Sequence, residues 1–488
     1  MGWIDNIVYK VSPEWAYKRE AWRQELDSIR NYDAGANDRN NANWHATNQS
    51  AELTDRYDRD RVRARARDLE RNSDMALSVT KAFKRNIVGG GFKLQARTPN
   101  DSLNDQIEEY WEEWCKKENC DVTGTQSFNQ ILRMAVQRKK VDGGILFVKR
   151  YTEDGLIPFK LQAIEVDELA QDAISDNERV VGGIKYNQYN KPIGYYIKQY
   201  DIDGYTINQP VYIPAKDVIF LYSKKRPSQI REMSDMAPTL PRIRDINEFM
   251  VAVSVKERIA ACLAVFIKKL NPNGGGIGGR NTTSVQDKKY DGKTLIPGMI
   301  RELNVNEEVD TINPSGQATD AASFVKLQQR LLAAGQGISY EATSRDMSEV
   351  NYSSARQGNI EDDLEYTEDG ELIEDFMSDV YESFVTCLYL TGLITINDFL
   401  KKKSQYLKHE WVKAPKRWID PVKEATANKI ALATGQKTLR DIAAENGRDW
   451  KEVVDEMAEI IEYGKEKGID LGGVIFGTKG NNTKKADQ

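Results

Sequence analysis

The sequence predicts a mixed α+β protein with several domains. Three observations support this class: a length of 488 residues, a β-rich stretch over 145–222, and long helical patterns on both sides of it. Apolar residues make up 40% of the chain and charged residues 30%, which is polar for a globular protein but outside the disordered range. We therefore expect a chain that buries a sizeable core.

The N-terminal part of the chain is expected to form helices that lead into a strand. Residues 1–55 are rich in Asn, Asp and Ala and read as an exposed arm with short helices. From residue 56 to 84 apolar side chains recur at helical spacing, and Ser73 or Asn72 is placed to cap a second helix. Residues 87–94 then predict a turn into a strand.

The β-rich stretch follows two more amphipathic helices, expected over 103–118 and 127–141. Trp111 and Trp114 in the first of them are expected in the core. Within 145–222, short alternating or apolar runs are separated by turn signals, so several short strands are expected. A mixed domain over 56–237 results.

Long helices dominate the rest of the chain. Apolar spacing predicts a helix from Pro238 to about Leu270, read as buried and amphipathic because three charged residues interrupt it, and hence not as a membrane span. Residues 319–335 are helical, 337–351 are read as non-helical, and 353–390 form a helix with one kink at Gly370. The C-terminal part, 423–467, is expected to be largely helical.

Composition limits the classes of function. The chain has 69 Lys and Arg against 75 Asp and Glu, a formal charge of −6, which disfavours a protein that clamps nucleic acid over most of its surface. The charge balance leaves room for contact at a restricted site. Four cysteines and two histidines are too few for a disulfide framework or a zinc site, so Cys115 and Cys120 read as ordinary thiols. No signal peptide is visible at the N-terminus, and we expect a soluble protein that is cytoplasmic when made.

Most enzyme motifs are missing. Gly292-Lys293-Thr294 ends like a phosphate-binding loop, but Asp287 stands where the first glycine is needed. The glycine-rich run 274–279 neither follows a strand nor opens a helix, so it reads as a loop. Two histidines leave little room for a Ser-His or Cys-His dyad. No cofactor and no catalytic residue are therefore expected.

Two charged segments have competing interpretations. Residues 361–382 hold eleven Asp or Glu and no Lys or Arg. They read as a solvated or partner-facing helix face; the alternative is a metal-dependent nuclease or protease that uses this acidic helix, with Asp362 and Asp363 among its residues. Residues 56–71 hold seven Arg and four acidic residues, which favours ion pairs to neighbouring elements over a DNA-reading element.

Three blocks of sequence, in order, resemble the lambda family of tailed-phage portal proteins. The first is Arg63-Ala-Arg-Ala-Arg-Asp-Leu-Glu-Arg-Asn72 with Ile87-Val-Gly-Gly-Gly-Phe92. The second is Tyr340-Glu341 with Asp346-Met-Ser-Glu-Val-Asn-Tyr-Ser-Ser-Ala-Arg356. The third is Ile419-Asp-Pro-Val-Lys-Glu-Ala425, followed by Thr438 to Gly447 and by Asp449-Trp450. The resemblance covers roughly residues 56–465.

The resemblance implies a non-enzymatic portal fold, assembled as a dodecameric ring at one capsid vertex. Its parts are a mixed α/β wing, a two-helix stem, a small clip module, a tunnel loop, a long kinked helix and an α-helical crown. They map as follows: N-terminal arm 1–55; wing 56–237, continued by the long helix at 353–420; stem helices 238–270 and 319–336; clip 271–318; tunnel loop 337–352; crown and tail 421–488.

The resemblance also implies functional residues and partners. The DNA channel would be lined at the tunnel loop by Ser344, Arg345, Asp346, Met347, Ser348, Glu349, Asn351 and Tyr352. Terminase or adaptor docking on the clip would involve Arg280, Lys288, Lys289 and Lys293. The implied partners are further copies of the chain, double-stranded DNA, the terminase large subunit, the major capsid and scaffold proteins, and a head–tail adaptor, with no membrane. The implied location is the virion, and the host cytoplasm during assembly.

Overall fold

The chain divides into two compact units, Met1–Thr54 and Asp55–Gln488. The structure is a computed structural model that describes residues 12–30, 43, 46–153, 155–171, 179–205, 209–261, 265–269, 307–311, 321–415 and 420–469. In the first unit, α2 (Pro13–Arg30) presents Trp15, Tyr17 and Trp22 to solvent. The short helix α3 (Ala51–Asp55) lies at the boundary between the units.

The second unit begins with two helices and a strand, as predicted. Helix α4 (Arg59–Asn72) is separated from α5 (Asp74–Ile87) by Ser73, whose side chain accepts from the Ala76 amide at the start of α5. Ser73, rather than Asn72, is therefore the cap. Strand β1 (Phe92–Ala96) follows and pairs antiparallel with β11 (His409–Lys413), a strand from far along the chain.

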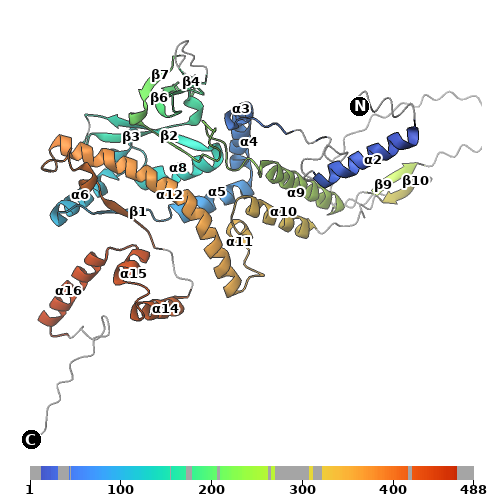
Figure 1. The fold of residues 1–488 in the computed structure, drawn as a ribbon. Helices are drawn as coiled ribbons and strands as arrows, with labels where there is room; N and C mark the ends of the chain where they lie inside the picture. Colours follow the sequence, from blue (N-terminus) through green and yellow to red (C-terminus); the bar gives the residue numbers. More distant parts are fainter. Residues whose placement is uncertain are drawn as a thin grey trace, which may run out of the picture. The chain divides into compact units, whose positions relative to one another are not determined.

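A layered core forms the centre of the second unit (Figure 1). One antiparallel sheet has the order β3-β2-β8 and another the order β4-β5-β6-β7. In the first sheet, Ile145 and Phe147 face a helical layer that contains α8 and α12, whereas Leu146 and Val148 face the second sheet. The strands are β2 (Gly144–Tyr151), β3 (Phe159–Ile164), β4 (Val180–Val181), β5 (Ile184–Tyr186), β6 (Pro192–Ile197), β7 (Val211–Pro214) and β8 (Val218–Tyr222).

The helical layer packs through aromatic side chains. Trp111 and Trp114 are 3% and 0% exposed, which confirms that they belong to the core. The Trp114 indole donates to the Phe159 carbonyl at 2.6 Å, so the polar atom of this buried ring has a partner. The helices and 3₁₀ turns that complete this region are α6 (Asp101–Trp114), α7 (Lys117–Cys120), α8 (Phe128–Asp142), η2 (Val166–Glu168), η3 (Ala215–Asp217) and α13 (Lys403–Tyr406).

The helix predicted from Pro238 to Leu270 is shorter than expected. It is α9 (Leu240–Ala261), and residues Val265–Lys269 instead form β9, paired with β10 (Glu307–Thr311). The run Val-Phe-Ile at 265–267 has the β-branched and aromatic character of a strand. The expectation that this helix is buried holds only for its first part: Ile243 and Ile246 are fully buried, whereas Met250 and Val251 are 46% and 62% exposed. Among the described helices, none is long and apolar enough to cross a membrane.

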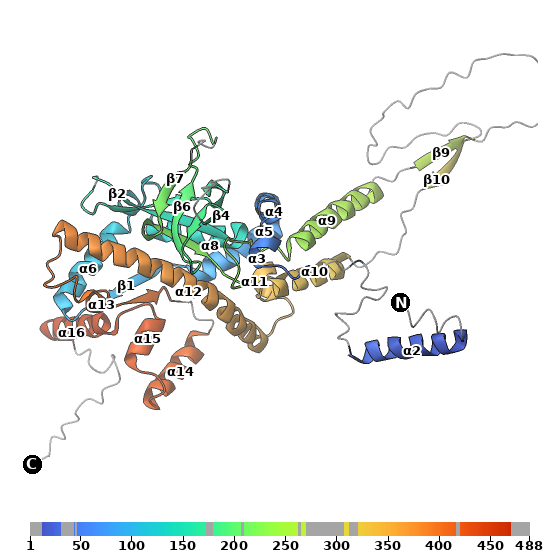
Figure 2. The ribbon, with the colours of Figure 1, turned by 45° about the horizontal axis from the view of Figure 1, so that its top comes forward.

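Helix α9 packs antiparallel against α10 (Ala321–Gly335). The rings of Phe249 and Phe324 are 4.6 Å apart, and at the other end Gln336 donates to the Thr239 hydroxyl at 2.9 Å. Leu327 and Leu331 of α10 remain exposed, like Met250 and Val251 of α9. Figure 2 shows this helix pair beside α4 and α11. Among the described residues, the pair therefore carries apolar surface that no other element covers.

The sequence predicts a non-helical stretch over 337–351, and this prediction is wrong in part. The short helix α11 (Tyr340–Ser344) lies within it. Ser339 caps α11 by accepting from the Ala342 amide, which explains the short helix. Helix α12 (Tyr352–Thr391) then runs 40 residues, confirming the predicted long helix, and it is continuous through Gly370. Figure 1 shows α12 changing direction along its length.

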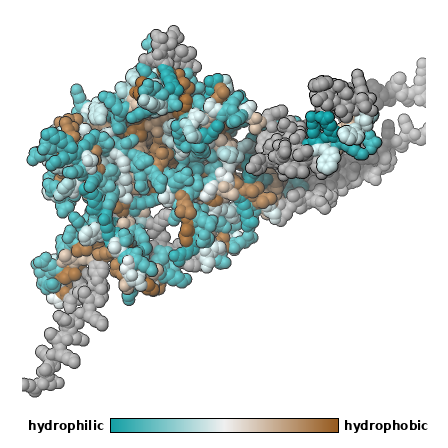
Figure 3. All heavy atoms as spheres, in the orientation of Figure 1, coloured by the Kyte–Doolittle hydropathy of each residue, from teal (hydrophilic) through white to brown (hydrophobic). Residues whose placement is uncertain are grey.

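The C-terminal part is helical, as predicted. It contains α14 (Pro421–Ala433), α15 (Leu439–Glu445) and α16 (Trp450–Glu466). Ion pairs hold it to β1 and β11, including Lys93 to Glu452 at 2.8 Å. The surface seen in Figure 3 is mostly hydrophilic, with apolar side chains breaking it at several separate places.

The arginines of α4 make ion pairs to neighbouring elements, which confirms the preferred interpretation of segment 56–71. Arg59, Arg63 and Arg67 lie four residues apart and point inward. Arg63 is 3% exposed and binds Asp167 and Glu232, each at 2.9 Å. Glu232 is also bound by its neighbour Arg231, and both of these side chains are fully buried. This buried charge cluster ties α4 to the segment that leads into α9.

Candidate functional site

The loop between α10 and α12 is tied to the long helix at its start. The Ser339 amide and hydroxyl donate to the two carboxylate oxygens of Asp362, at 2.6 and 2.7 Å. Asp362 lies in the first half of α12 and is 4% exposed, and its burial raises the pKa of the carboxyl group. Asp362 is thus a buried anchor for the loop.

The second half of the loop is held by its own polar side chains. Asp346 accepts from the Ser348 amide at 3.0 Å and from its hydroxyl at 2.6 Å, and these bonds lower the Asp346 pKa. Glu349 pairs with Lys326 of α10, whose hydrogen bond lowers the Glu349 pKa. Arg345 takes a left-handed conformation, with φ of 59°, as it ends α11. The loop therefore has a defined conformation anchored on both helices.

The eight residues implied as the channel-lining set follow one another from the end of α11 to the start of α12. Ser344 ends α11, Tyr352 begins α12, and Asn351 is the cap of α12. Arg345, Met347, Ser348 and Glu349 are exposed. The exposed surface mixes one cation with one anion, so it is not a basic clamp for phosphates.

Asn351 is the N-cap of the long helix α12. Its side chain, rather than a serine, accepts from the Ser354 amide at 2.9 Å. Replacing Asn351 by Ala should cost about 1 kcal/mol of helix stability, because one amide at the start of α12 loses its acceptor. Hydrogen exchange in the first turn of α12 measures this, and Asn351→Ser should retain most of the protection. Equal exchange in the Ala and Ser variants would contradict the capping role.

An open groove of about 1030 Å³ lies beside the loop. Its lining mixes charges of both signs, with Arg85, Arg345 and Lys413 facing Glu341 and Asp363. Pairs of opposite charge distributed in this way do not form a site for one kind of ion.

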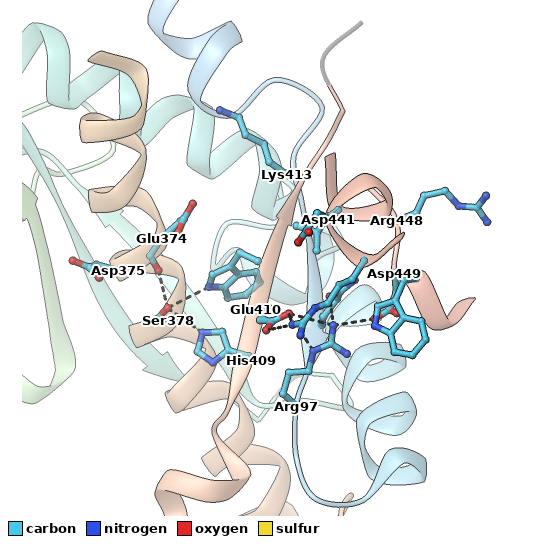
Figure 4. A pocket seen from close by; sticks show the side chains of 16 residues that line it. Arg97, Glu374, Asp375, Ser378, His409, Glu410, Lys413, Asp441, Arg448 and Asp449 are labelled. Atoms are coloured by element: carbon cyan, nitrogen blue, oxygen red, sulfur yellow. Dashed lines mark hydrogen bonds and ion pairs between the residues drawn. The ribbon is translucent and has the colours of Figure 1, made fainter. Parts of the chain in front are cut away.

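A second pocket, of about 830 Å³, contains His409 beside a serine (Figure 4). The Ser378 hydroxyl lies 3.0 Å from His409 Nε2, but the other ring nitrogen contacts the Leu407 carbonyl at 2.7 Å rather than a carboxylate. Burial lowers the pKa of His409. Ser378 also accepts from the Trp411 indole, so this pair is part of the packing between α12 and β11. The arrangement lacks the third group of a catalytic triad.

The same pocket holds a charged contact between β11 and the C-terminal helices. Arg440 of α15 donates to both carboxylate oxygens of Glu410, at 2.5 and 2.8 Å. Arg97 bridges Glu410 and Asp449, at 3.2 and 3.1 Å (Figure 4). The hydrogen bond from Arg440 holds the Glu410 pKa below its ordinary value. Ionised Glu410 therefore stabilises the contact.

This contact should weaken in acid. Because the folded-state pKa of Glu410 is lowered, its contribution is present above the ordinary pKa of glutamate and is lost as pH falls through the folded-state value. In the wild type, the hydrogen-exchange protection of α15 should decrease as the pH is lowered. In Glu410→Gln, the protection should be low at every pH and should change little with pH. Glu456→Gln on α16, whose partner is Arg448, is the matched control. An unchanged pH dependence in Glu410→Gln would contradict the assignment.

The acidic residues at 361–382 serve packing and surface roles in the structure. Asp369 accepts from the buried Lys139, which Asp235 also binds at 2.9 Å. Burial opposes the charge on Lys139, but the two carboxylates outweigh it and raise its pKa. Glu382 pairs with Lys403. Within the part of the chain that the structure describes, no three His, Cys, Asp or Glu side chains are grouped to hold a metal ion.

The predictions for the clip residues and for the two cysteines have different outcomes. The clip residues Arg280, Lys288, Lys289 and Lys293 lie outside the described residues. Cys115 and Cys120 are free thiols, and burial raises the Cys120 pKa to about 12, which fits an ordinary unreactive thiol.

Sequence reasoning missed Arg231, Glu232 and the anchor role of Asp362. Their partners are distant in sequence, so no local spacing identifies them.

Helix α10 and the 40-residue helix α12 thus frame an anchored connecting loop. The profile described as "Phage portal protein, lambda family" matches residues 37–368, more than half of the chain. The chain therefore belongs to the lambda family of phage portal proteins, which are virion components and not enzymes.

Relatives support this assignment over most of the length. The chain is 24% identical over 432 residues to the probable portal protein of Halomonas phage phiHAP-1, covering 84% of this chain and 82% of that one. It is 21% identical over 458 residues to portal protein B of Escherichia phage lambda, covering 84% and 85%. Among solved structures, a chain of the virion of a native gene transfer agent particle matches with a TM-score of 0.44 and 12% identity, covering 78% of this chain and 93% of that one.

Proposed function

We propose that this portal protein forms a dodecameric ring at a unique capsid vertex and is the channel for packaging and ejection of double-stranded DNA. The observation that carries the proposal is the antiparallel pair α9 and α10 leading into an anchored loop and the 40-residue helix α12. The exposed Met250, Val251 and Leu327 on this pair need neighbours to cover them. A head-to-tail contact repeated around an axis closes into a ring and covers such surface.

The proposal also assigns each part of the chain to a part of the portal. The wing comprises 56–237 and the long helix within 353–420, and the stem comprises the two helices within 238–270 and 319–336. The clip is 271–318, between the stem helices, and is the docking site for the terminase large subunit and the head–tail adaptor. The crown is the helical region after 421, and residues 1–55 are an N-terminal arm. The capsid and scaffold proteins would contact the ring within the shell.

The loop 337–352 is the tunnel loop and faces the DNA. Its exposed tip carries Arg345, Met347 and Glu349, a nearly neutral set. A surface without excess positive charge forms few phosphate contacts, so DNA can slide past it. Tight binding would oppose movement in either direction.

Particles assembled without this chain should contain no packaged DNA. The measurement is nuclease-protected DNA in particles from cells that lack the gene, with the wild-type chain supplied separately as the control. A normal amount of protected DNA without the chain would contradict the proposed channel.

A further inference from the structure

We propose that neighbouring copies of this chain bind head to tail through two specific surfaces of the wing. The outer stripe of α12 on one copy meets the outer face of the four-stranded sheet on the next. This inference rests on the proposed ring and adds which surfaces of the two copies meet.

The first surface is a stripe of exposed side chains on α12. Ile360, Leu364, Glu368, Glu371 and Asp375 follow one another at spacings of four, four, three and four residues, which places them on one side of the helix. Ile360 and Leu364 are 51% and 70% exposed. We call this set the α12 stripe: it is apolar at one end and acidic at the other.

The second surface is a platform of tyrosines and lysines on the sheet β4-β5-β6-β7. The rings of Tyr196 and Tyr212 are 5.2 Å apart, and the Lys185 amine lies 5.6 Å from the centre of the Tyr212 ring. A Cβ on Gly194 would come within 2.3 Å of the Tyr212 ring, so this ring lies directly over the glycine. Lys191 is exposed in the turn before β6. We call these residues the Tyr–Lys platform.

The two surfaces are complementary in chemistry. The described residues of strands β4 to β7 include no Asp or Glu, whereas the α12 segment 361–382 includes no Lys or Arg. Aromatic rings offer contact area to Ile360 and Leu364, and lysines offer charge to Glu368 and Glu371. One copy therefore supplies the opposite charge and a matching apolar surface to the next.

The two surfaces also lie on opposite sides of the layered core. The sheet β3-β2-β8 stands between them, with Phe147 directed toward α12 and Leu146 directed toward the four-stranded sheet. Figure 1 shows β2 and β3 between α12 and the strands β4, β6 and β7. Surfaces on opposite sides cannot pair as an isologous dimer; they form a heterologous contact, the kind that builds a ring when the rotation between copies closes.

The test is charge reversal in the full-length chain, with the fraction of protein in rings measured by light scattering and negative-stain imaging. Lys185→Glu with Lys191→Glu, or Glu368→Lys with Glu371→Lys, should lower this fraction about tenfold or more, because like charges then face each other. The chain carrying all four changes should recover rings, since every contact again pairs opposite charges. Glu459→Lys with Glu462→Lys on α16 is the matched control and should leave rings unchanged.

The outcomes separate this interface from the proposed ring itself. Rings in the wild type and in both charge-reversed variants would overturn the interface and leave the proposed ring standing. The interface would also be overturned if both twofold variants lose their rings and the fourfold variant does not recover them, while circular dichroism shows that the fourfold variant is folded. A platform variant that keeps its rings but lowers DNA retention would assign the lysines and tyrosines to nucleic acid instead. A wild-type chain that never forms rings would contradict the proposed function and the interface together.

Discussion

Deleting Ser344–Ser348 should leave the ring intact but strongly reduce the DNA packaged or retained in particles. The deletion removes the exposed tip, including Met347, which is 56% exposed. It removes the bonds between Asp346 and Ser348 but spares the residues that tie the loop to α12 and α10: Ser339 with Asp362, and Glu349 with Lys326. Ring assembly should persist because these anchors, and not the tip, hold α10, α11 and α12 together.

Two readouts and one control make this result specific. Negative-stain images report ring assembly, and nuclease-protected DNA per particle reports packaging. A variant in which Ser344–Ser348 is replaced by a Gly-Ser sequence of equal length separates the loss of length from the loss of side chains. Normal packaging by the deletion variant would contradict the assignment of this loop to the channel.

Replacing Glu232 by Gln should lower the free energy of unfolding by about 3–5 kcal/mol, because it removes a fully buried negative charge that Arg63 and Arg231 share. Glu232 is fully buried and binds Arg63 at 2.9 Å and Arg231 at 2.7 Å. The cluster joins α4 to the segment before α9, so its loss should also loosen the start of the stem.

Urea unfolding followed by circular dichroism measures this effect. Glu248→Gln is the matched control: Glu248 pairs with Arg244 at 2.7 Å on the exposed side of α9. An exposed pair of this kind contributes about 0.3–0.5 kcal/mol. A loss below about 1 kcal/mol for Glu232→Gln would mean that the cluster does not act as a buried charge network.

Much of the fold follows from local sequence signals. Ser73 caps α5, and the left-handed Gly143 ends α8 one residue beyond the end of the helix predicted over 127–141. The alternating runs in 145–222 form strands because their apolar faces meet two separate cores. Each of these features depends on neighbours within a few residues, which is why the sequence reveals them.

Features that depend on distant partners were not predicted. The end of α9 at Ala261 and the strand β9 depend on pairing with β10, some forty residues further along the chain. The anchor between Ser339 and Asp362 and the pair of Arg63 with Glu232 join elements that local spacing does not connect. The position of the loop in the candidate site could be predicted from the resemblance to the portal family. The contacts that anchor the loop could be identified only from the structure.

The most direct test of the central claim is the assembly state of the purified full-length chain. Light scattering and negative-stain imaging should show closed rings with a central hole and a mass near twelve times 55.5 kDa. A chain that remains at 55.5 kDa at every concentration and ionic strength, and is absent from assembled particles, would contradict the account.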